Sequence, residues 1–475
     1  MPGPRLIEIL LKQRKAQLND GAPTAEQRID RLNRCIGLLV DRRRDIEAAL
    51  TTDFGARSPT VTAFADVASS IGPLKHARDH VRHWMKTERR RTTPRILGFL
   101  GARAEIRYQP KGVVGVISPW NFPVNLTFAP LAGVLAAGNR AMIKPSETTP
   151  ATSELLKQMF ASAFDESEIA VVTGGPEVGQ AFSSLPFDHL VFTGATAIGR
   201  HVMRAAAENL VPVTLELGGK SPVVIGHSAD MSVAAARIMN GKTLNAGQIC
   251  LAPDYVLAPA DRLPDFVNAA KASVGKMFPS IRESPDYTAI VTDRHYARLM
   301  DYLDDARAKG AEIVEINPSA EDLRQQPHRR IAPTLILNPT DEMKVMQEEI
   351  FGPLLPVKAY HDVQDAIDYI NAHDRPLGLY YFGSDAAERD RVLDGTTSGG
   401  VTVNDVVMHV AQEELPFGGI GPAGMGAYHG HDGFREFSHR KSIYHQIKWD
   451  LAPLRMLRPP YGAGLAKYLG MQIKR

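Results

Sequence analysis

From residue 112 onward, short apolar runs alternate with longer alanine-rich segments, and no other feature constrains the fold as much. The runs are rich in β-branched residues and have the length of buried strands, whereas the segments between them have helical spacing. A strand, a helix and a second parallel strand form the repeating unit of a doubly wound sheet, so we expect an α/β protein. The expected strands are GVVGVIS (112–118), RAMIKPS (140–146), IAVVTG (169–174), HLVFTG (189–194), PVTLEL (212–217), SPVVIG, PDYVLA, APTLILNP, LLPVKAY, YYFG and GGVTVN.

The first hundred residues have the spacing of helices. Leu32, Ile36 and Leu39 recur on one face, with arginines opposite. Cys35 lies beside this face, and we interpret it as a core residue because unpaired cysteines are usually buried. The basic segment KTERRRTTPR (86–95) is interpreted as a solvent-exposed helix end.

Two local patterns define element boundaries. RAEIRYQPKG (103–112) alternates apolar and polar residues, which predicts a partly exposed strand. Thr149 followed by Pro150 predicts the start of a helix. Thr149 would be the N-cap, and Pro150 would occupy the first helical position.

Residues 112–138 contain no charged side chain and form a stretch long enough to span a bilayer. Pro119, Pro123 and Pro130 interrupt it. Each proline removes a backbone donor, so a lipid-exposed segment would contain unpaired polar groups. We therefore expect a buried strand, a turn and a buried helix here, and no transmembrane segment.

Composition narrows the functional class. The chain has 475 residues and a formal net charge of +2, which gives no indication of nucleic-acid binding. Its two cysteines, Cys35 and Cys250, give neither a disulfide framework nor a metal-ligand pattern, so we expect no metal. This cysteine usage and the absence of a signal-peptide pattern at the N-terminus favour a cytoplasmic protein.

Several strand ends carry candidate binding residues. The turn HLVFTGATAIGR (189–200) places Gly194 and Gly199 where a strand passes into a helix, and such turns let backbone amides approach a phosphate. Because the full GxGxxG pattern is missing, an ordinary strand–helix turn is an equal alternative. Lys144 and Glu147 end another strand and could hold ribose hydroxyls, or could form a surface ion pair.

Three polar residues are candidates for chemistry. Cys250, in NAGQICLAP, is either a nucleophile or a small buried residue. Glu216, in ELGGKSP, is either a carboxylate beside a tight turn in a cleft or a solvent-exposed glutamate. Asn121, in SPWNFP, is a rigid amide that could donate to an oxyanion. Taken singly, these segments do not decide between the alternatives.

Seven segments occur in one order between residues 118 and 421: SPWNFP, KPSE, FTG, ELGGKSP, GQIC, EEIFGP and PFGGIG. Together they resemble the NAD(P)-dependent aldehyde dehydrogenase superfamily over nearly the whole chain, and the interval from Glu216 to Cys250 also matches. NFPVNLTFAPLAGVLAAGN, VTVND and GMGAYHG are similar to its class 3 branch. ILGFLGARAEIRYQPKGVVGVISPWNFP with KPSETTP is most similar to bacterial coniferyl aldehyde dehydrogenases. Ala195 departs from the FTGS of many members, which removes a hydroxyl beside the cofactor.

The resemblance implies oxidation of an aldehyde to a carboxylic acid. Cys250 would add to the carbonyl as a thiolate and form a thiohemiacetal, while Asn121 and the backbone amide of Cys250 hold the oxyanion. Loss of a hydride then leaves a thioester. Water activated by Glu216 would hydrolyse that thioester.

The resemblance also implies NAD as the cofactor, with NADP possible. Lys144 and Glu147 would hold the adenosine ribose, and Glu147 would favour NAD by crowding a 2′-phosphate. Glu349 would hold the nicotinamide ribose, with Phe351 packed against it. The remaining implied cofactor contacts are Gly194, Gly199 and Trp120.

The implied fold is a Rossmann-type cofactor domain, an α/β catalytic domain and a small β oligomerisation element. Residues 1–94 and 111–214 would form the first domain, and residues 215–413 the second. Residues 95–110 and 434–448 would form strands that bridge a homodimer. A C-terminal tail at 449–475 would follow.

The substrate is expected to be a small-molecule aldehyde, either aromatic and coniferaldehyde-like or of medium chain length. Apolar residues near the catalytic turns form either a substrate funnel or plain core; they are Phe122, Leu126, Phe128, Ile249 and Leu251. His409 lies at the funnel mouth or is an ordinary surface histidine. The alternatives are a broad-specificity alkanal or fatty-aldehyde dehydrogenase, a CoA-acylating aldehyde dehydrogenase and a non-catalytic cofactor-binding protein.

Overall fold

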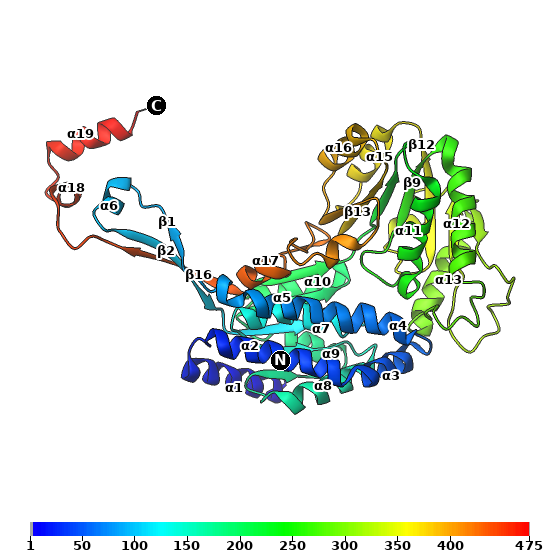
Figure 1. Ribbon diagram of the computed structural model, residues 1–475, viewed down its shortest axis with the longest axis horizontal. Coiled ribbons are helices and arrows are strands. Elements are labelled where there is room, and N and C mark those ends of the chain that lie inside the picture. Colours follow the sequence, from blue (N-terminus) through cyan, green and yellow to red (C-terminus); the bar gives the residue numbers. More distant parts are fainter. Residues whose placement is uncertain (1–2, 475) are drawn as a thin grey trace. The chain divides into compact units, whose positions relative to one another are not determined.

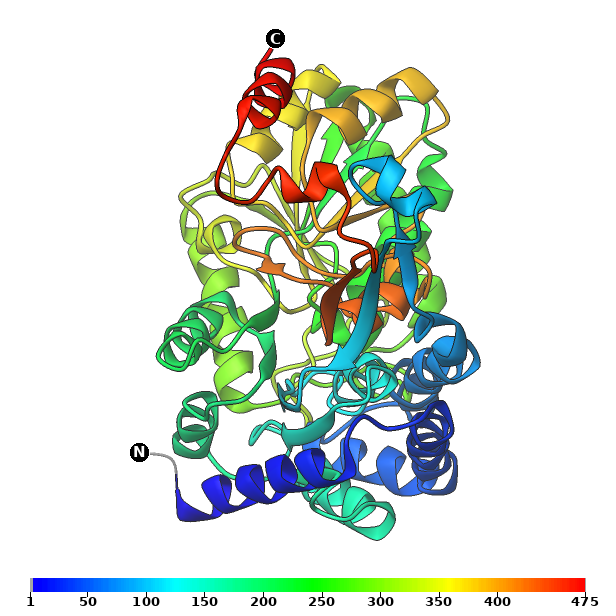
Figure 2. The ribbon, with the colours of Figure 1, turned by 90° about the vertical axis from the view of Figure 1, so that its left-hand side faces the viewer.

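The computed structural model describes residues 3–474, which form two compact units. The first contains the chain up to Trp84 together with Pro110–Ser438, and the second contains Met85–Gln109 and the chain from His439 onward. Figure 1 and Figure 2 show the elements of both units in two views. All candidate site residues lie in the first unit.

The first unit contains a six-stranded sheet with the strand order β15-β7-β6-β3-β4-β5. All neighbours are parallel except β15, which runs antiparallel to β7. The strands are β3 (Val113–Ile117), β4 (Arg140–Lys144), β5 (Ile169–Val171), β6 (His189–Gly194), β7 (Val213–Leu217) and β15 (Gly424–Met425). The helices between consecutive strands are α7 (Asn125–Ala136), α8 (Pro150–Ala163), α9 (Pro176–Ser183) and α10 (Thr196–Ala207). The α/β fold and its parallel sheet are as predicted.

The order of this sheet reverses between β3 and β6. From β3 the chain adds β4 and β5 on one side, and then returns to add β6 and β7 on the other. In open parallel sheets, ligands bind at the carboxyl ends of the strands that flank such a reversal. Asn121 follows β3 and Gly194 ends β6, so both residues lie at this point.

Amino-terminal helices pack on the helices of this sheet, as the apolar spacing predicts. Helix α2 packs against α5, α5 against α7, and α3 against α8 (Figure 1). The amino-terminal helices are α1 (Pro4–Asp20), α2 (Ala25–Asp41), α3 (Arg43–Phe54), α4 (Pro59–Thr62) and α5 (Ser69–Trp84), with a π-helical segment at Ala63–Ala68. Cys35, in α2, is fully buried, which confirms its interpretation as a core residue.

A seven-stranded sheet with the order β10-β11-β12-β9-β8-β13-β14 forms the other half of the first unit. Val223 and Ile225 of β8 enter an apolar cluster with α11 and α12, whereas Val224 enters a second cluster with α13 and α15, because successive strand residues face opposite sides. The strands are β8 (Pro222–Ile225), β9 (Tyr255–Pro259), β10 (Glu312–Glu315), β11 (Thr334–Leu337), β12 (Leu354–Tyr360), β13 (Gly378–Phe382) and β14 (Gly400–Val403). The helices are α11 (Met231–Thr243), α12 (Leu263–Met277), α13 (Asp293–Ala308), α14 (Lys344–Gln347), α15 (Val363–Asn371), α16 (Ala386–Gly395) and, packed on α7, α17 (Gly430–Glu436).

The second unit is organised around a three-stranded sheet with the order β1-β2-β16. Its elements are β1 (Glu88–Arg90), α6 (Arg95–Phe99), β2 (Arg103–Pro110), β16 (Ser438–His445), α18 (Ala452–Arg455) and α19 (Ala463–Gln472). The strand expected at 103–112 is confirmed. The helix end expected at 86–95 is wrong, because Glu88–Arg90 pairs antiparallel with β2 and the preceding helix already ends at Trp84. Basic composition marks exposure and does not distinguish a helix end from an edge strand.

The start of α8 is predicted correctly at Pro150, but its cap is not. The side chain of Thr149 makes no capping hydrogen bond. Asp53, at the end of α3, accepts hydrogen bonds from the backbone amides of Ala151 and Thr152 instead. A carboxylate from a neighbouring helix thus satisfies the free N–H groups, which local sequence cannot reveal.

The uncharged stretch at 112–138 contains the buried strand β3 and the helix α7, as expected. Among the helices of residues 3–474, none combines the length and the apolar character that a membrane crossing requires.

Candidate active site

A cavity of about 810 Å³ is lined by residues that follow β3, β6 and β7 and by loops of the seven-stranded sheet. The predicted site residues that line it are Trp120, Asn121, Gly194, Glu216, Cys250, Glu349 and Phe351. Among the described residues, Lys144, Glu147 and Gly199 are the predicted ones outside this lining. Residues far apart in the sequence therefore meet in one place, at the edge where parallel sheets bind ligands.

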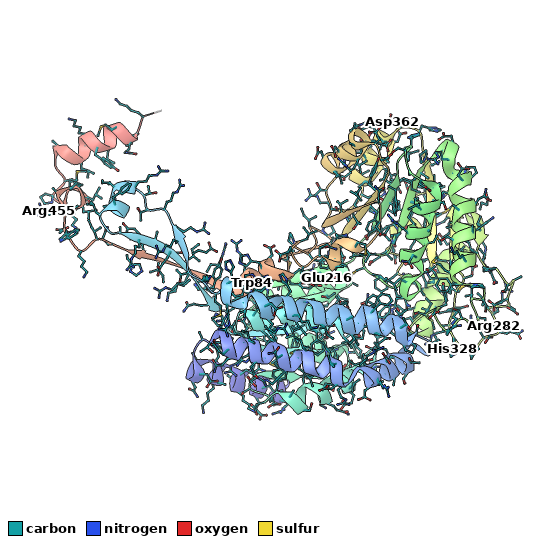
Figure 3. All side chains as sticks on the ribbon, in the orientation of Figure 1. Trp84, Glu216, Arg282, His328, Asp362 and Arg455 are labelled. Atoms are coloured by element: carbon teal, nitrogen blue, oxygen red, sulfur yellow. The ribbon has the colours of Figure 1, made fainter. Side chains whose placement is uncertain are left out.

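Cys250 and Glu216 face each other in this cavity. Sγ of Cys250 lies 3.5 Å from Oε1 of Glu216. Glu216 belongs to β7 of the six-stranded sheet, whereas Cys250 lies in the loop between α11 and β9 of the seven-stranded sheet. Each sheet thus contributes one reactive side chain, and Figure 3 labels Glu216 in its strand.

Hydrogen bonds hold both oxygens of the Glu216 carboxylate. Oε1 accepts from Cys250, and Oε2 accepts from the hydroxyls of Tyr428 at 2.6 Å and Thr193 at 3.3 Å. The side chain is buried, so the solvent-exposed alternative for Glu216 is wrong. Burial raises the pKa of Glu216 above its usual range, and these three hydrogen bonds lower it. A carboxylate with a raised pKa is suited to act as a general base near neutral pH.

The loop before Cys250 has an uncommon backbone. Asn245, Ala246 and Gly247 have positive φ angles of 49°, 52° and 74°. This left-handed conformation is costly for residues other than glycine, and it occurs where the surrounding structure fixes it. A Cβ atom at Gly247 would lie 2.3 Å from the carbonyl oxygen of Gly352, so only glycine fits there.

The side chain of Gln248 anchors this loop. Nε2 donates to the carbonyl oxygens of Asn245 and Ala289, and Oε1 accepts from the backbone amide of Val291. Gln248 is completely buried, so these bonds are not exchanged with water. They fix the backbone two residues before Cys250.

Burial dominates the electrostatics of the thiol. It raises the pKa of Cys250 well above its usual range, and the charges of Glu216 and Glu349 raise it further. The protonated thiol is therefore the favoured form in this environment.

Asn121 is held from both ends. Its Nδ2 donates to the carbonyl oxygen of Gln248 at 3.2 Å, which places the amide beside the loop of Cys250. The backbone carbonyl oxygen of Asn121 accepts from Nη1 of Arg57 at 2.8 Å and from Nδ2 of Asn245 at 3.2 Å. A fixed amide next to a nucleophile is the arrangement that stabilises an oxyanion.

A buried ion pair contacts the turn that carries Asn121. Nη2 of Arg57 lies 2.6 Å from Oδ2 of Asp66, and both side chains are fully buried. Oδ1 of Asp66 accepts from the backbone amides of Val124 and Asn125, at the start of α7. The pair therefore connects the turn that carries Asn121 to the first turn of the helix that follows it.

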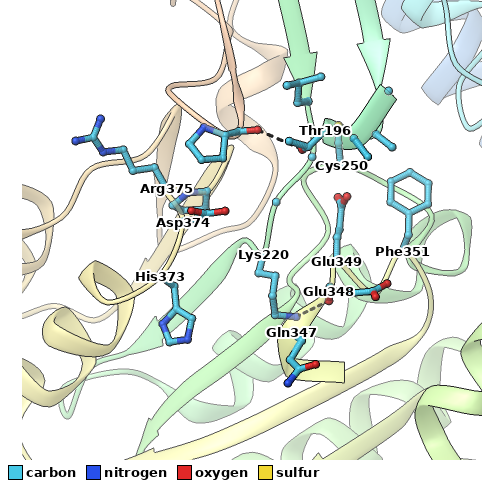
Figure 4. Close-up of a pocket in the computed structure, with 18 of the residues that line it drawn as sticks. Thr196, Lys220, Cys250, Gln347, Glu348, Glu349, Phe351, His373, Asp374 and Arg375 are labelled. Atoms are coloured by element: carbon cyan, nitrogen blue, oxygen red, sulfur yellow. Dashed lines mark hydrogen bonds between the residues drawn. The ribbon is translucent and has the colours of Figure 1, made fainter. Parts of the chain in front are cut away.

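Glu349 has one carboxylate oxygen without a partner. Within the described part of the chain, its Oε1 is buried and makes no hydrogen bond. The carboxylate lies against the glycine turn, because a Cβ at Gly218 would be 2.0 Å from Oε2. Burial and the charge of Asp254 raise the pKa of Glu349 to about 8. In Figure 4 the carboxylate points toward Cys250, so a free acceptor faces the cavity.

Aromatic rings form the wall beside Glu349. The ring of Trp120 lies 5.3 Å from that of Phe351 and 4.9 Å from that of His295, both in edge-to-face contact. Phe351 has a positive φ of 51°, a strained conformation for an aromatic residue. Such strain is found at binding sites, where it fixes the direction of a side chain.

The other predicted cofactor residues lie at the same sheet edge. Nζ of Lys144, at the end of β4, forms an ion pair with Glu147, but the Lys144 side chain is buried, so the pair is not the surface contact of the alternative. The ribose contacts of both residues stay a prediction. A Cβ at Gly199 would lie 2.6 Å from Cδ2 of Leu217, which shows that α10 packs closely on β7. The residues that could hold a dinucleotide are thus present: a carboxylate with one oxygen unpartnered among the described residues, a lysine and a close glycine turn.

Substrate-side residues are mostly core. Of the five apolar funnel candidates, only Leu126 lines the cavity among the described residues, and Phe128 stacks on Phe160 at 5.0 Å. The surface alternative for His409 is wrong, because its ring is 8% exposed and its Nδ1 lies 2.8 Å from Oγ1 of Thr402. Burial lowers the pKa of His409 to about 4.

Comparison with known proteins identifies the family. The aldehyde dehydrogenase family model matches residues 10–443. The chain belongs to the aldehyde dehydrogenase family. Members of this family oxidise aldehydes to carboxylic acids, so the aldehyde dehydrogenase activity inferred from the resemblance is confirmed.

The relatives of this aldehyde dehydrogenase agree with the predicted subgroup. The probable coniferyl aldehyde dehydrogenase of Caulobacter vibrioides is 70% identical over 98% of this chain and 96% of the relative. The coniferyl aldehyde dehydrogenase of Pseudomonas sp. is 54% identical over 97% and 95%. Family 3 aldehyde dehydrogenases are also among the relatives, which confirms the class 3 likeness. The substrate-bound structure of Staphylococcus aureus AldH matches with a TM-score of 0.91 and 37% identity over 99% of both chains.

Several residues of the site escape the sequence interpretation. Tyr428 lies inside the recognised GMGAYHG segment, but nothing local indicates that its hydroxyl reaches Glu216. Gln248 lies two residues before the nucleophile, inside the recognised GQIC segment, which is a signal for it. Arg57 and Asp66 leave no sequence signal, since their partners are the backbone of distant turns.

Proposed function

We propose that this aldehyde dehydrogenase oxidises aromatic aldehydes of the coniferaldehyde type, with NAD as cofactor, through a thioester on Cys250. The observation that carries the chemistry is the 3.5 Å contact between Sγ of Cys250 and the Glu216 carboxylate, in a cavity that Asn121 also lines. The substrate class is supported by the coniferyl aldehyde dehydrogenases among its relatives.

Carbon–sulfur bond formation begins the reaction. The Cys250 thiolate adds to the aldehyde carbon, and the carbonyl oxygen becomes an oxyanion. The side-chain amide of Asn121 and the backbone amide of Cys250 donate to that oxygen. One such donor stabilises the transition state by about 2.7–4 kcal/mol.

Residues around the unpartnered oxygen of Glu349 bind the cofactor. Glu349 would accept hydrogen bonds from the nicotinamide ribose, and Phe351 and Trp120 would enclose that end. Lys144 and Glu147 would hold the adenosine ribose. When bound, the nicotinamide would supply the acceptor for the hydride that leaves the substrate carbon, so that this carbon is oxidised to a thioester. This assignment is supported by the buried, unpaired Oε1 of Glu349 within the described chain.

Glu216 completes the reaction as a general base. It takes a proton from a water molecule that attacks the thioester carbon, the C–S bond breaks, and a carboxylic acid leaves with the Cys250 thiolate restored. Tyr428 and Thr193 hold Oε2, so Oε1, the oxygen that faces the sulfur, is the one that receives the proton. Burial raises the pKa of Glu216, which makes its carboxylate a stronger base.

Glu216→Gln separates this mechanism from its alternatives. The variant keeps acylation and hydride transfer but stalls hydrolysis, so we expect a burst of one reduced cofactor per site followed by slow turnover. Undiminished steady-state turnover would remove the base assignment, and parent-rate oxidation by Cys250→Ala would remove the nucleophile. Formation of an acyl-CoA when CoA is added would favour the CoA-acylating alternative.

The substrate class is tested with initial rates on coniferaldehyde, benzaldehyde and straight-chain alkanals. We expect the highest kcat/KM for coniferaldehyde. A profile led by alkanals would leave the thioester chemistry standing and replace the aromatic substrate by the alkanal alternative.

The cofactor preference is tested at Glu147. A carboxylate beside the adenosine ribose repels a 2′-phosphate, and like-charge contacts of this kind cost several kcal/mol. Glu147→Gln is expected to raise kcat/KM for NADP about tenfold relative to NAD. An unchanged ratio of kcat/KM for NADP to that for NAD would show that Glu147 does not determine the choice of cofactor.

We further propose a homodimer and the domain division given by the resemblance, with residues 95–110 and 434–448 as the bridging strands. The support is that β16 is an edge strand of its sheet, and a free edge can pair with a second copy. A monomeric mass by light scattering would contradict this. The cytoplasmic location stays a prediction.

A further inference from the structure

Two histidines one helical turn apart on α5 face an acidic residue from another part of the chain. His76 and His80 lie near Glu414, which follows the short 3₁₀ turn Met408–Ala411. One ligand atom from each of the three side chains lies within 4.8 Å of the others. None of the three lines the cavity at Cys250.

His80 is oriented as metal-binding histidines are. Its Nδ1 lies 2.8 Å from the backbone carbonyl oxygen of His76. A carbonyl oxygen only accepts, so Nδ1 carries the proton and the lone pair is on Nε2. A carbonyl behind the ring is the usual device that fixes the tautomer and direction of an imidazole ligand.

The contact between His76 and Glu414 is short without being a hydrogen bond. Nε2 of His76 lies 3.0 Å from Oε1 of Glu414. Nevertheless, over residues 3–474, this buried nitrogen has no hydrogen-bond partner of acceptable geometry. Two ligands bound at about 2.0–2.1 Å to one tetrahedral ion lie about 3.3 Å apart. The spacing therefore suits two donors that share a cation.

Stacked rings restrict the movement of the two imidazoles. The rings of His76 and His80 stack at 4.3 Å, and that of His80 stacks on Trp84 at 5.7 Å. Trp84, the last residue of α5, is labelled in Figure 3. Because this stack holds the rings in place, less conformational entropy is lost when they bind a ligand.

The charge of the cluster also favours a cation. Glu413 and Glu414 are adjacent, and neither forms an ion pair with a lysine or arginine among the described residues. Oε2 of Glu413 is buried and unpaired in the same part of the chain. A bound cation would be the largest local charge in such a site and would offset the two carboxylates.

We propose that His76, His80 and Glu414 bind one divalent transition-metal ion of the zinc type. Imidazole and carboxylate ligands suit Zn²⁺, Co²⁺ and Ni²⁺, and two histidines at i and i+4 on a helix are a common part of such sites. Water would occupy the remaining position. The ion joins α5 to the segment that follows Met408–Ala411 and thereby stabilises the folded chain.

Zinc also binds thiolates, so the test uses the full chain with Cys250→Ser, in which the reactive sulfur is absent. Calorimetric titration with Zn²⁺ is expected to give one ion per chain, and Zn²⁺ is expected to raise the Tm. In this background, His80→Ala and Glu414→Gln should each weaken binding about 10- to 100-fold. His83→Ala, an exposed histidine on the same helix, is the matched control and should keep the affinity.

The outcomes are distinct. No stoichiometric Zn²⁺ binding in the Cys250→Ser protein would overturn the proposal, as would binding that His80→Ala leaves unchanged. Loss of binding in His80→Ala with full affinity in Glu414→Gln would indicate a simple histidine pair and would also overturn the three-ligand site. Far-UV circular dichroism confirms that each variant is folded.

Discussion

The hydroxyl of Tyr428 donates a 2.6 Å hydrogen bond to Oε2 of Glu216, across 212 residues of sequence. Both side chains are buried, so water does not replace this bond when it is lost. The bond favours the charged form of Glu216 and lowers its pKa, in opposition to burial.

Tyr428→Phe is therefore expected to raise the pKa of Glu216 further. Since Glu216 must be deprotonated to act as a base, the acid limb of the kcat profile should move to higher pH. A hydrogen bond to a charged group is worth about 1.5–3 kcal/mol, so turnover below that limb should fall about 10- to 100-fold. Steady-state rates across pH measure this. Tyr461→Phe, at an exposed residue, is the control, and identical profiles for both variants would contradict the assignment.

The rate of Cys250 alkylation distinguishes two effects of Glu216 on the thiol. If Glu216 only repels the thiolate charge, its removal speeds alkylation; if Glu216 takes the thiol proton, its removal slows alkylation. Burial raises the pKa of the Cys250 thiol, and the charge of Glu216, 3.5 Å away, raises it further. Iodoacetamide labelling should thus be slow at pH 7 and increase with pH, as the thiolate fraction grows. In Glu216→Gln, Cys250 should be alkylated faster at the same pH. Mass spectrometry measures the labelled fraction over time.

Slower labelling in Glu216→Gln would show instead that Glu216 removes the thiol proton. Cys250→Ser is the control and should remain unlabelled, because Cys35 is fully buried.

The Arg57–Asp66 pair allows a comparison of buried and exposed ion pairs. Arg57→Met leaves Asp66 buried without its partner, and breaking such a pair costs about 3–5 kcal/mol of the free energy of unfolding. Activity should also fall, because the Asn121 carbonyl loses a donor. Arg42→Met removes an exposed pair with Asp45 and should cost at most about 1 kcal/mol. Urea unfolding measures the free energy of unfolding of both variants. Equal losses in the two would show that the buried pair contributes no more than the exposed one.

Two glycines near β15 differ in their surroundings. Both Gly421 and Gly424 have positive φ, but a Cβ at Gly424 would lie 2.0 Å from the carbonyl oxygen of Leu215, whereas a Cβ at Gly421 has open space. Gly421→Ala is expected to cost about 1 kcal/mol. Gly424→Ala adds a clash with the backbone next to Glu216 and should cost about 3 kcal/mol or more, with loss of turnover. Thermal unfolding checks this, and similar Tm values would count against the pairing of β15 with β7.

The sheets were predictable because their strands are buried apolar runs. Three edge strands were not: β10 carries a glutamate at each end, β15 is two residues long, and β1 is basic. Their pairing depends on a neighbouring strand, which local periodicity does not contain.

The candidate site was predictable where a motif surrounds a residue, as it does for Cys250, Glu216 and Glu349. The supporting residues were not, because Arg57 and Asp66 act on backbone groups that only the fold brings near. The same holds for α8, whose cap comes from Asp53 and not from the adjacent Thr149. Long-range polar contacts require the tertiary structure.

Glu216 pairs with Gly424, a residue that the ribosome adds much later, so the site around Glu216 is completed late in synthesis. At about 5–20 residues per second, the ribosome adds Tyr428 about 10–40 s after Glu216. From the addition of Cys250 until the end of this interval, the nascent chain contains the nucleophile and the base but lacks β15 and the Tyr428 hydroxyl that holds the base. Premature termination before residue 424 therefore yields a chain with both reactive side chains and no finished catalytic centre.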